Sequence, residues 1–183
     1  MGAAEEIIAV YDPSGSVIGS AERGVVYRDG LWHGATGVLL RSVDGERVLL
    51  HRRTADKLIW PGLHDCWAGG VIGPDESIEA AARRELAEEL GVRGVPLTAL
   101  EHFAFDAAGV RCHMFTFETR WDGPLSLQPE EVAWAGWVTL DELRARLAAP
   151  SRWPFVPDGR MGIDRWLARR GPATPAVSMP PSC

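Results

Sequence analysis

Three glutamates on one face of a predicted helix constrain this chain more than any other feature of its sequence. Residues 77–90 start with a helix-capping serine and are followed directly by Gly91, which predicts a helix that ends there. Glu85, Glu88 and Glu89 have the i, i+3, i+4 spacing, so their carboxylates share one side of the helix. Like charges at this spacing repel one another, and the arrangement makes best sense if a cation neutralises them.

An apolar stripe accompanies these carboxylates along the same helix. It predicts that the helix packs on a sheet and presents its acidic side chains at the edge of that contact. The stripe consists of Ile78, Ala82, Leu86 and Leu90. Arg84 precedes Glu88 by four residues, which predicts an ion pair that helps to hold the glutamate side chain.

The chemistry of these ligands indicates which cation they would hold. Carboxylate oxygens suit hard divalent ions, and a site with few protein ligands and several retained waters suits Mg²⁺, with Mn²⁺ as a substitute. Phosphate oxygens are the natural remaining ligands. We therefore expect a magnesium site that binds a small molecule carrying phosphate groups. The competing interpretation is a solvated acidic helix face, which is the ordinary role of a glutamate-rich helix.

Overall charge limits the other partners of this chain. Its 183 residues include 19 Lys and Arg against 25 Asp and Glu, which gives a formal charge of -6. This balance offers no general attraction to nucleic acid or to an anionic membrane, so neither is expected as a partner. No apolar run approaches the 18 residues of a membrane span, and the N-terminus is acidic where a signal peptide would be basic. The oligomeric state stays open, with a homodimer as one alternative.

The cysteines indicate the cellular compartment. Cys66, Cys112 and Cys183 are widely scattered and lack CxxC spacing, which argues against a zinc site and a disulfide framework. A reducing cytoplasm is the expected location. We interpret Cys66 as a buried or half-buried thiol.

The rest of the chain predicts a strand-rich single domain over residues 1–170. β-prone runs bounded by turn residues occur at 7–11, 17–21, 32–42, 47–54, 66–71, 97–106, 111–119 and 132–138. The first two form an N-terminal hairpin at about 6–22. A capping box at Thr139 predicts a helix through Leu147, and an amphipathic segment follows at 161–169. The proline-rich tail, 171–183, is expected to be disordered. This order of elements predicts an α+β fold, with a mixed β-sheet in an α/β/α sandwich.

The sequence around the acidic helix resembles the Nudix box: a glycine, five residues, a glutamate, seven residues, then Arg-Glu-aliphatic-any-Glu-Glu-any-Gly-aliphatic. Gly70, Glu76 and the run 84–92 match every fixed position. The resemblance implies the Nudix fold and an Mg²⁺-dependent pyrophosphohydrolase that cleaves a diphosphate linkage in a nucleotide or related nucleoside-diphosphate derivative. Asp75 stands where many members have glycine, and we expect a local difference in shape there.

The same resemblance implies roles for the residues of the box. The carboxylates that would hold the essential metal are Glu85, Glu88 and Glu89. Arg84 and Glu76 would stabilise the loop and the helix, Gly70 would permit the turn, and Gly91 would end the helix.

Residues 47–67 and 151–166 resemble the branch of the superfamily that contains isopentenyl-diphosphate isomerase, and residues 68–71 with 75–76 resemble bacterial hydrolases of the YfcD type. The resemblance spans most of residues 5–170. Arg53 and Lys57 match positions that contact diphosphate in the isomerases, although ordinary surface charge is the alternative. His33 matches one of their metal-binding histidines, but its companion position is Val26. We therefore interpret His33 as a packed strand histidine.

The isomerase apparatus itself is missing from this sequence. The positions of the family's catalytic cysteine and metal-binding histidine are Gly69 and Val71, and its Glu-x-Glu falls near Ala108 and Val110. Because none of these side chains can carry a proton or bind a metal, we expect hydrolysis. An isomerase-like enzyme and a non-catalytic ligand-binding module with the Nudix fold are the alternatives.

The general base is not determined by the box. A box glutamate could serve, and so could Glu130 or Glu131, which lie in a loop before the strand predicted at 132–138. An acidic pair in such a loop commonly faces solvent, so Glu130 and Glu131 are either ordinary surface residues or candidates for the base.

Overall fold

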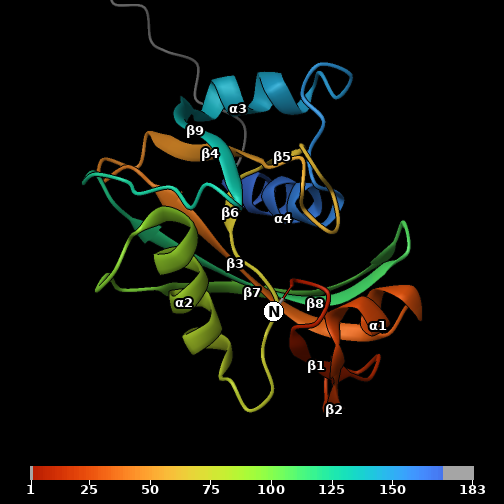
Figure 1. Cartoon of the computed structure of the whole chain (residues 1–183). Coiled ribbons are helices and arrows are strands. Elements are labelled where there is room, and N and C mark those ends of the chain that lie inside the picture. The colour runs from red at the N-terminus through yellow and green to blue at the C-terminus, as the bar shows by residue number, and fades with distance from the viewer. Residues whose placement is uncertain (1, 171–183) are drawn as a thin grey trace, which may run out of the picture.

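A computed structural model describes residues 2–170 of the chain (Figure 1). The tail that the sequence predicts to be disordered, 171–183, lies outside the described residues, as does Cys183.

Within residues 2–170, nine strands form one mixed sheet around a long central strand. The strands are β1 (Ile7–Tyr11), β2 (Val17–Glu22), β3 (Trp32–Arg41), β4 (Arg47–Arg53), β5 (His64–Asp65), β6 (Trp67–Ala68), β7 (Thr98–Ala107), β8 (Val110–Arg120) and β9 (Val132–Thr139). The central β3 pairs in parallel with β8 along its whole length and antiparallel with β1, β4 and β6. This confirms the mixed sheet that the sequence predicts.

Helices cover both faces of this sheet (Figure 1). They are α1 (Arg23–Arg28), α2 (Ile78–Leu90), α3 (Leu140–Leu147) and α4 (Pro157–Ala168). Successive side chains of a strand point to opposite faces, and β3 shows this directly: Leu40 packs with α2, whereas Leu39 packs with α3 and α4. The two cores on either side of the sheet make the fold the predicted α+β arrangement, an α/β/α sandwich.

Three local elements differ from the sequence prediction. The short helix α1 was not predicted, and it buries Val26 against β1. Helix α4 begins at Pro157 instead of 161, because proline suits the first helical position although Pro-Asp-Gly resembles a turn. The strand predicted over 66–71 is only two residues long, since the chain then turns toward α2.

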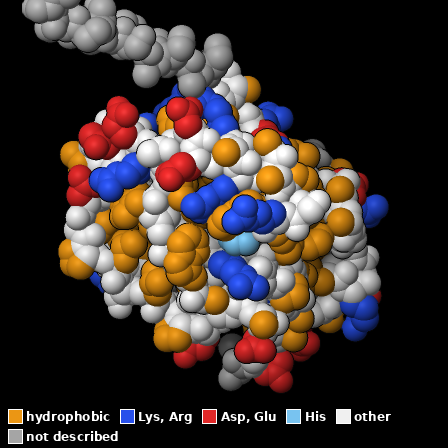
Figure 2. All heavy atoms as spheres, turned by 90° about the horizontal axis from the view of Figure 1, so that it is seen from above, with side chains coloured by type: hydrophobic (Ala, Val, Ile, Leu, Met, Phe, Trp, Pro, Cys, Tyr) orange, Lys and Arg blue, Asp and Glu red, His pale blue; other side chains and the backbone are white. Residues whose placement is uncertain are grey.

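Charge is unevenly distributed on the surface. In the view from above, basic side chains surround a histidine while acidic groups gather elsewhere (Figure 2). A chain of net negative charge therefore still contains locally basic places, as binding a phosphate-bearing ligand requires. Among the described residues, no helix is both long and apolar enough to cross a bilayer.

Candidate active site

Helix α2 forms where the sequence predicts it. The Ser77 hydroxyl accepts a hydrogen bond from the amide of Ala80 at 3.2 Å, and the helix ends at Gly91. Leu86 and Leu90 are buried against the sheet, as the apolar stripe predicts. The acidic side of the helix is thereby fixed at the edge of this contact.

Arg84 connects the acidic helix to the loop before it. Its guanidinium donates two hydrogen bonds to the carboxylate of Glu76, at 2.9 and 3.0 Å, and a third to the carbonyl oxygen of Val71 at 3.1 Å. It also contacts Glu85 at 2.7 Å and Glu88 at 3.4 Å. The predicted Arg84 to Glu88 pair is therefore present, and Arg84 holds loop and helix together.

The three glutamates of the box differ in burial. Glu89 is 3% exposed and accepts a hydrogen bond from the amide of Gly69 at 3.1 Å. Burial, reinforced by the charge of Glu85, raises the pKa of Glu89 to about 8. Burial also raises the pKa of Glu85, although Arg84 opposes this shift. The Glu88 side chain is half exposed, so two carboxylates point inward and the third borders solvent.

The need for glycine at position 70 has a different cause from the one expected. Gly70 is not among the glycines with positive φ, so the turn itself does not require it. A Cβ at this position would instead lie 2.3 Å from an oxygen of Glu85. Asp75, in contrast, has a φ of 59°, a left-handed conformation that aspartate tolerates better than most residues. The backbone thus has at Asp75 a conformation that would suit glycine.

The donor chemistry of these residues fits a divalent cation. Two buried carboxylates side by side are unfavourable without a positive partner, and the raised pKa values of Glu85 and Glu89 express this. Oxygen donors of this kind suit Mg²⁺ or Mn²⁺. Within residues 2–170, however, no group of three or more His, Cys, Asp or Glu side chains is arranged to hold a metal ion. A cation would therefore have to displace Arg84 from Glu85 or draw its other ligands from elsewhere.

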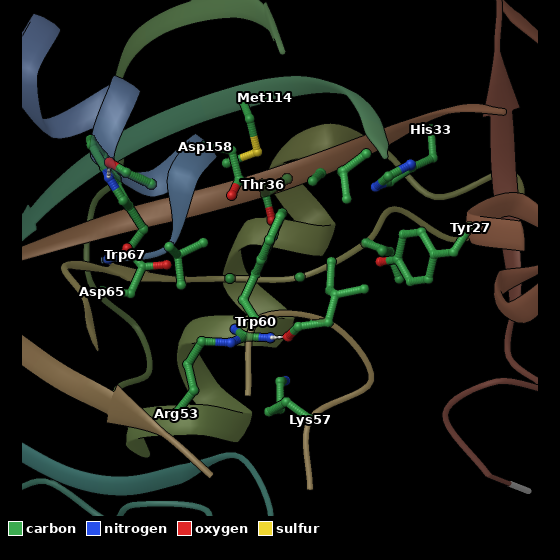
Figure 3. Close-up of a pocket in the computed structure, with 18 of the residues that line it drawn as sticks. Tyr27, His33, Thr36, Arg53, Lys57, Trp60, Asp65, Trp67, Met114 and Asp158 are labelled. Carbon is green, nitrogen blue, oxygen red and sulfur yellow. Dashed lines mark hydrogen bonds between the residues drawn. The ribbon is translucent and has the colours of Figure 1, made fainter. Parts of the chain in front are cut away.

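A cleft that is partly open to solvent adjoins these carboxylates through Gly69 and Gly70 (Figure 3). Arg53 and Lys57 line the same cleft, as the resemblance implies for diphosphate contacts. Arg53 donates a hydrogen bond to the carbonyl oxygen of Ile59 at 3.2 Å. Burial and the neighbouring Arg53 lower the pKa of Lys57 to about 8. The structure therefore brings the predicted phosphate-binding cations beside the acidic helix.

The two candidate bases in the loop before β9 are placed differently. Glu131 forms an ion pair with Lys57 and so borders the cleft. Glu130 is exposed, and its backbone carbonyl oxygen accepts a hydrogen bond from the Thr54 hydroxyl at 2.8 Å. Geometry thus associates Glu131, but not the side chain of Glu130, with the cationic part of the cleft.

Several residues that line the cleft escaped the sequence analysis. They are Arg23, Tyr27, Thr36, Asp65 and Asp158. No motif contains them, and they come together only because α1, β3, β5 and the start of α4 converge. A weak signal existed for Asp158, because acidic residues are favoured in the first turn of a helix after proline.

His33 and Cys66 behave as the sequence analysis interprets them. His33 is buried on β3 and packs edge-to-face against Tyr27, with ring centroids 5.2 Å apart. Burial lowers the pKa of His33 to about 4. Cys66 is a free, buried thiol whose pKa burial raises.

Comparison with known proteins identifies the family to which this chain belongs, and with it the class of enzyme, a pyrophosphohydrolase. The NUDIX domain model matches residues 31–159, and the chain belongs to the Nudix family. An uncharacterized Nudix hydrolase of Rhodococcus erythropolis is 48% identical over 166 residues, 86% of this chain and 89% of that protein. YfcD of Escherichia coli, also named an uncharacterized Nudix hydrolase, is 34% identical over 167 residues, 91% of this chain and 89% of that protein.

Solved structures share the fold at low sequence identity. DR0079 from Deinococcus radiodurans has a TM-score of 0.74 at 24% identity, over 87% of this chain and 98% of that one. The NUDIX domain of Shewanella oneidensis NrtR, crystallised with ADP ribose, has a TM-score of 0.61 at 20% identity, over 76% of this chain and 89% of that one. The Nudix fold thus binds a small nucleotide derivative in that protein, and Nudix enzymes generally use a divalent metal ion.

Proposed function

We propose that this Nudix enzyme hydrolyses a diphosphate linkage in a nucleotide or related nucleoside-diphosphate derivative, with Mg²⁺ as its cofactor. The observation that supports this most strongly is the juxtaposition of buried Glu85 and Glu89 with a cleft lined by Arg53 and Lys57. Carboxylates and cations on adjoining walls suit a ligand that carries both a divalent ion and phosphate oxygens.

The residues of the Nudix box would have separate roles. Glu85, Glu88 and Glu89 would hold the cation, which supplies charge stabilisation at phosphorus when bound. Arg84 would keep the ligand-bearing helix in register with the loop through Glu76. To hold the cation, Glu85 would give up its contact with Arg84, and Arg84 would keep its two hydrogen bonds to Glu76.

The cationic wall binds and orients the diphosphate. The guanidinium of Arg53 presents several donors in one plane, whereas Lys57 provides a compact positive charge. On substrate binding Lys57 exchanges Glu131 for phosphate oxygens, which releases the Glu131 carboxylate. We therefore propose Glu131 ahead of Glu130 as the base that takes a proton from the attacking water, with a box glutamate as the alternative.

The cleft favours hydrolysis over double-bond isomerisation. The positions where the isomerases have a catalytic cysteine, a metal-binding histidine and an acidic residue are Gly69, Val71 and Val110, and all of them line this cleft. Isomerisation needs an acid and a base on opposite faces of a carbon-carbon bond, and these residues provide neither. Two free, buried cysteines, Cys66 and Cys112, accord with a cytoplasmic enzyme.

A substrate panel tests this proposal. The purified full chain is incubated with nucleoside di- and triphosphates, dinucleotides, nucleotide sugars and prenyl diphosphates, with Mg²⁺ or with EDTA. We expect phosphate or nucleoside monophosphate to be released from at least one nucleotide, and release to stop in EDTA. Turnover that continues in EDTA, or proton exchange into isopentenyl diphosphate without hydrolysis, would contradict the proposal.

A further inference from the structure

Polar atoms without partners are concentrated in the cleft. Among the described residues, several side chains that line it have a buried nitrogen or oxygen atom with no hydrogen-bond partner: His33, Thr36, Arg53, Trp60 and Asp158. Buried polar atoms in folded proteins nearly always have partners. Such a concentration in one cleft indicates that a bound molecule supplies the missing hydrogen bonds.

Two of these unpartnered groups lie away from the cationic wall. Asp158 and Thr36 lie together with Met114 on one side of the view in Figure 3, whereas Arg53 and Lys57 lie on the other. Thr36 is only 2% exposed, and its hydroxyl oxygen has no partner. The Oδ1 atom of Asp158 is likewise buried and unpartnered. The cleft therefore has a cationic side and a side that offers hydrogen-bond acceptors.

A second carboxylate, Asp65, adjoins Asp158. Its Oδ1 atom accepts hydrogen bonds from the amides of Cys66 at 2.7 Å and Trp67 at 3.2 Å. Burial, together with the charge of Asp158, raises the pKa of Asp65 to about 7. Two neighbouring carboxyl groups in a buried place are unfavourable unless donors reach them.

The backbone holds this carboxylate pair in place before any ligand binds. β5 pairs with the segment before α4, since the amide of His64 donates to Pro154 and the amide of Val156 donates to His64, both at 2.9 Å. A Cβ at Gly159 would lie 2.4 Å from Asp65, so glycine allows the start of α4 to approach this closely. The acceptors are thus preorganised, which lowers the entropic cost of binding.

We propose that Asp158, Thr36 and Asp65 form a subsite that binds hydrogen-bond donors, hydroxyl or amino groups, on the moiety attached to the diphosphate. This inference rests on the proposed hydrolytic function. A sugar diol or the amino group of a base provides such donors. A prenyl chain provides none and would leave Asp158 and Thr36 buried without partners, which is strongly unfavourable. The indole rings of Trp60 and Trp67 line the same cleft and suit a flat ring beside these donors.

Analogues that lack single donors test the subsite. The value of kcat/KM is measured with Mg²⁺ for ADP, for 2′,3′-dideoxy-ADP, for purine riboside diphosphate without the amino group, and for isopentenyl diphosphate. We expect isopentenyl diphosphate and at least one of the two nucleotide analogues to fall about tenfold or more below ADP. A lower kcat/KM for the dideoxy analogue identifies the donor as the sugar diol, and a lower kcat/KM for the purine analogue identifies it as the amino group. Values within twofold for all four compounds would overturn the inference.

Substitutions test the residues separately. Thr36→Val and Asp158→Asn should lower kcat/KM for ADP about tenfold and change it for isopentenyl diphosphate less than twofold. Thr119→Val is the matched control, because Thr119 is equally buried but donates to the carbonyl oxygen of Pro96 at 2.7 Å. It should lower stability and leave the substrate ranking unchanged. If the ratio of kcat/KM for ADP to that for isopentenyl diphosphate stays unchanged in both Thr36→Val and Asp158→Asn, the subsite is contradicted. This holds whether the two values fall together or do not fall.

Failure of the subsite can be separated from failure of the proposed function. If no diphosphate is hydrolysed, the hydrolytic proposal is wrong. Calorimetric titration of ADP and its two analogues in EDTA then decides the subsite alone. Weaker binding of one analogue would support it, and equal affinities for all three would overturn it.

Discussion

Two acidic groups of this protein differ in their partners: the α2 carboxylates adjoin the cleft through Gly69 and Gly70, whereas Asp65 and Asp158 line it directly. The α2 carboxylates have cations nearby, since Arg84 contacts Glu85 and the charge of Lys57 acts on Glu89. Asp65 and Asp158 line the cleft itself: burial and the charge of Asp158 raise the pKa of Asp65, whereas Arg53 opposes this shift, and the Asp65 carboxylate accepts its hydrogen bonds from backbone amides. The first group is suited to a metal ion, and the second to uncharged or cationic donors of a substrate.

This difference shows that acidity alone does not define a metal site. Carboxylates on consecutive turns of one helix stay close in every conformation of that helix, so a cation or a proton must offset their repulsion. Asp65 and Asp158 come from distant parts of the chain, and their repulsion exists only because the fold brings them together. The following experiments separate the two groups.

The largest effect is expected from Glu89→Gln. Loss of a buried ligand carboxylate should lower kcat at least about 100-fold, because the amide holds a divalent cation far more weakly. Steady-state kinetics of product release with Mg²⁺ measures this. Glu79→Gln is the control on the same helix, since Glu79 is exposed and forms an ion pair with Arg83 at 2.7 Å, and the kcat of this variant should stay within twofold of the wild type. Equal kcat in the Glu89→Gln variant and the wild type would refute the assignment of the metal carboxylates.

Magnesium should stabilise the protein through the α2 carboxylates and not through the aspartates. At about 100 times its dissociation constant, a ligand of the folded state adds about 2.7 kcal/mol to the free energy of unfolding. For a chain of this size the melting temperature should rise by about 5–10 °C. Differential scanning fluorimetry should show this rise in the wild type and in Asp65→Asn, but not in Glu89→Gln. If the rise in melting temperature with magnesium disappears in Asp65→Asn, the metal binds at the aspartates and not at the α2 carboxylates.

The aspartate pair should make stability depend on pH. The folded-state pKa of Asp65, about 7, lies above its ordinary value of 3.8, so the folded protein binds the proton more tightly. The stabilisation is complete below about pH 4 and is lost as pH rises to about 7. Since one pKa unit corresponds to about 1.4 kcal/mol, the loss is on the order of 2 kcal/mol between pH 5 and pH 8.

Urea unfolding in EDTA at these two pH values checks this prediction. Asparagine at position 65 cannot titrate. From pH 5 to pH 8 the free energy of unfolding should therefore fall further in the wild type than in Asp65→Asn. The same difference at both pH values would show that Asp65 does not titrate in this range.

The smallest effect is expected from the cap of the acidic helix. Ser77→Ala removes the hydrogen bond to the Ala80 amide and should lower the free energy of unfolding by about 1 kcal/mol. Activity should change less than twofold, because Arg84 and the buried leucines still position the carboxylates. Urea midpoints and initial rates measure the two quantities. A large loss of activity in Ser77→Ala would show that the cap at the start of α2 is needed to position the α2 carboxylates.

Much of the fold follows from local patterns in the sequence. The strands β3, β4, β8 and β9 and the helices α2 and α3 lie within a few residues of their predicted positions. Alternation, capping residues and turn dipeptides are local signals, so they need no knowledge of the tertiary structure. The start of α4 at Pro157 was misjudged because the same residues occur in turns and at helix starts, and α1 was missed because no capping side chain marks its start.

The sequence by itself determined the acidic face of α2, because helical spacing fixes which side chains are neighbours. Only the tertiary structure decided which residues meet in the cleft beside it. Arg53, Lys57 and Glu131 meet through the pairing of β4 with β9, and Asp65 meets Asp158 because β5 pairs with the segment before α4. Contacts between residues far apart in the chain depend on how the sheet assembles, and no local spacing encodes them.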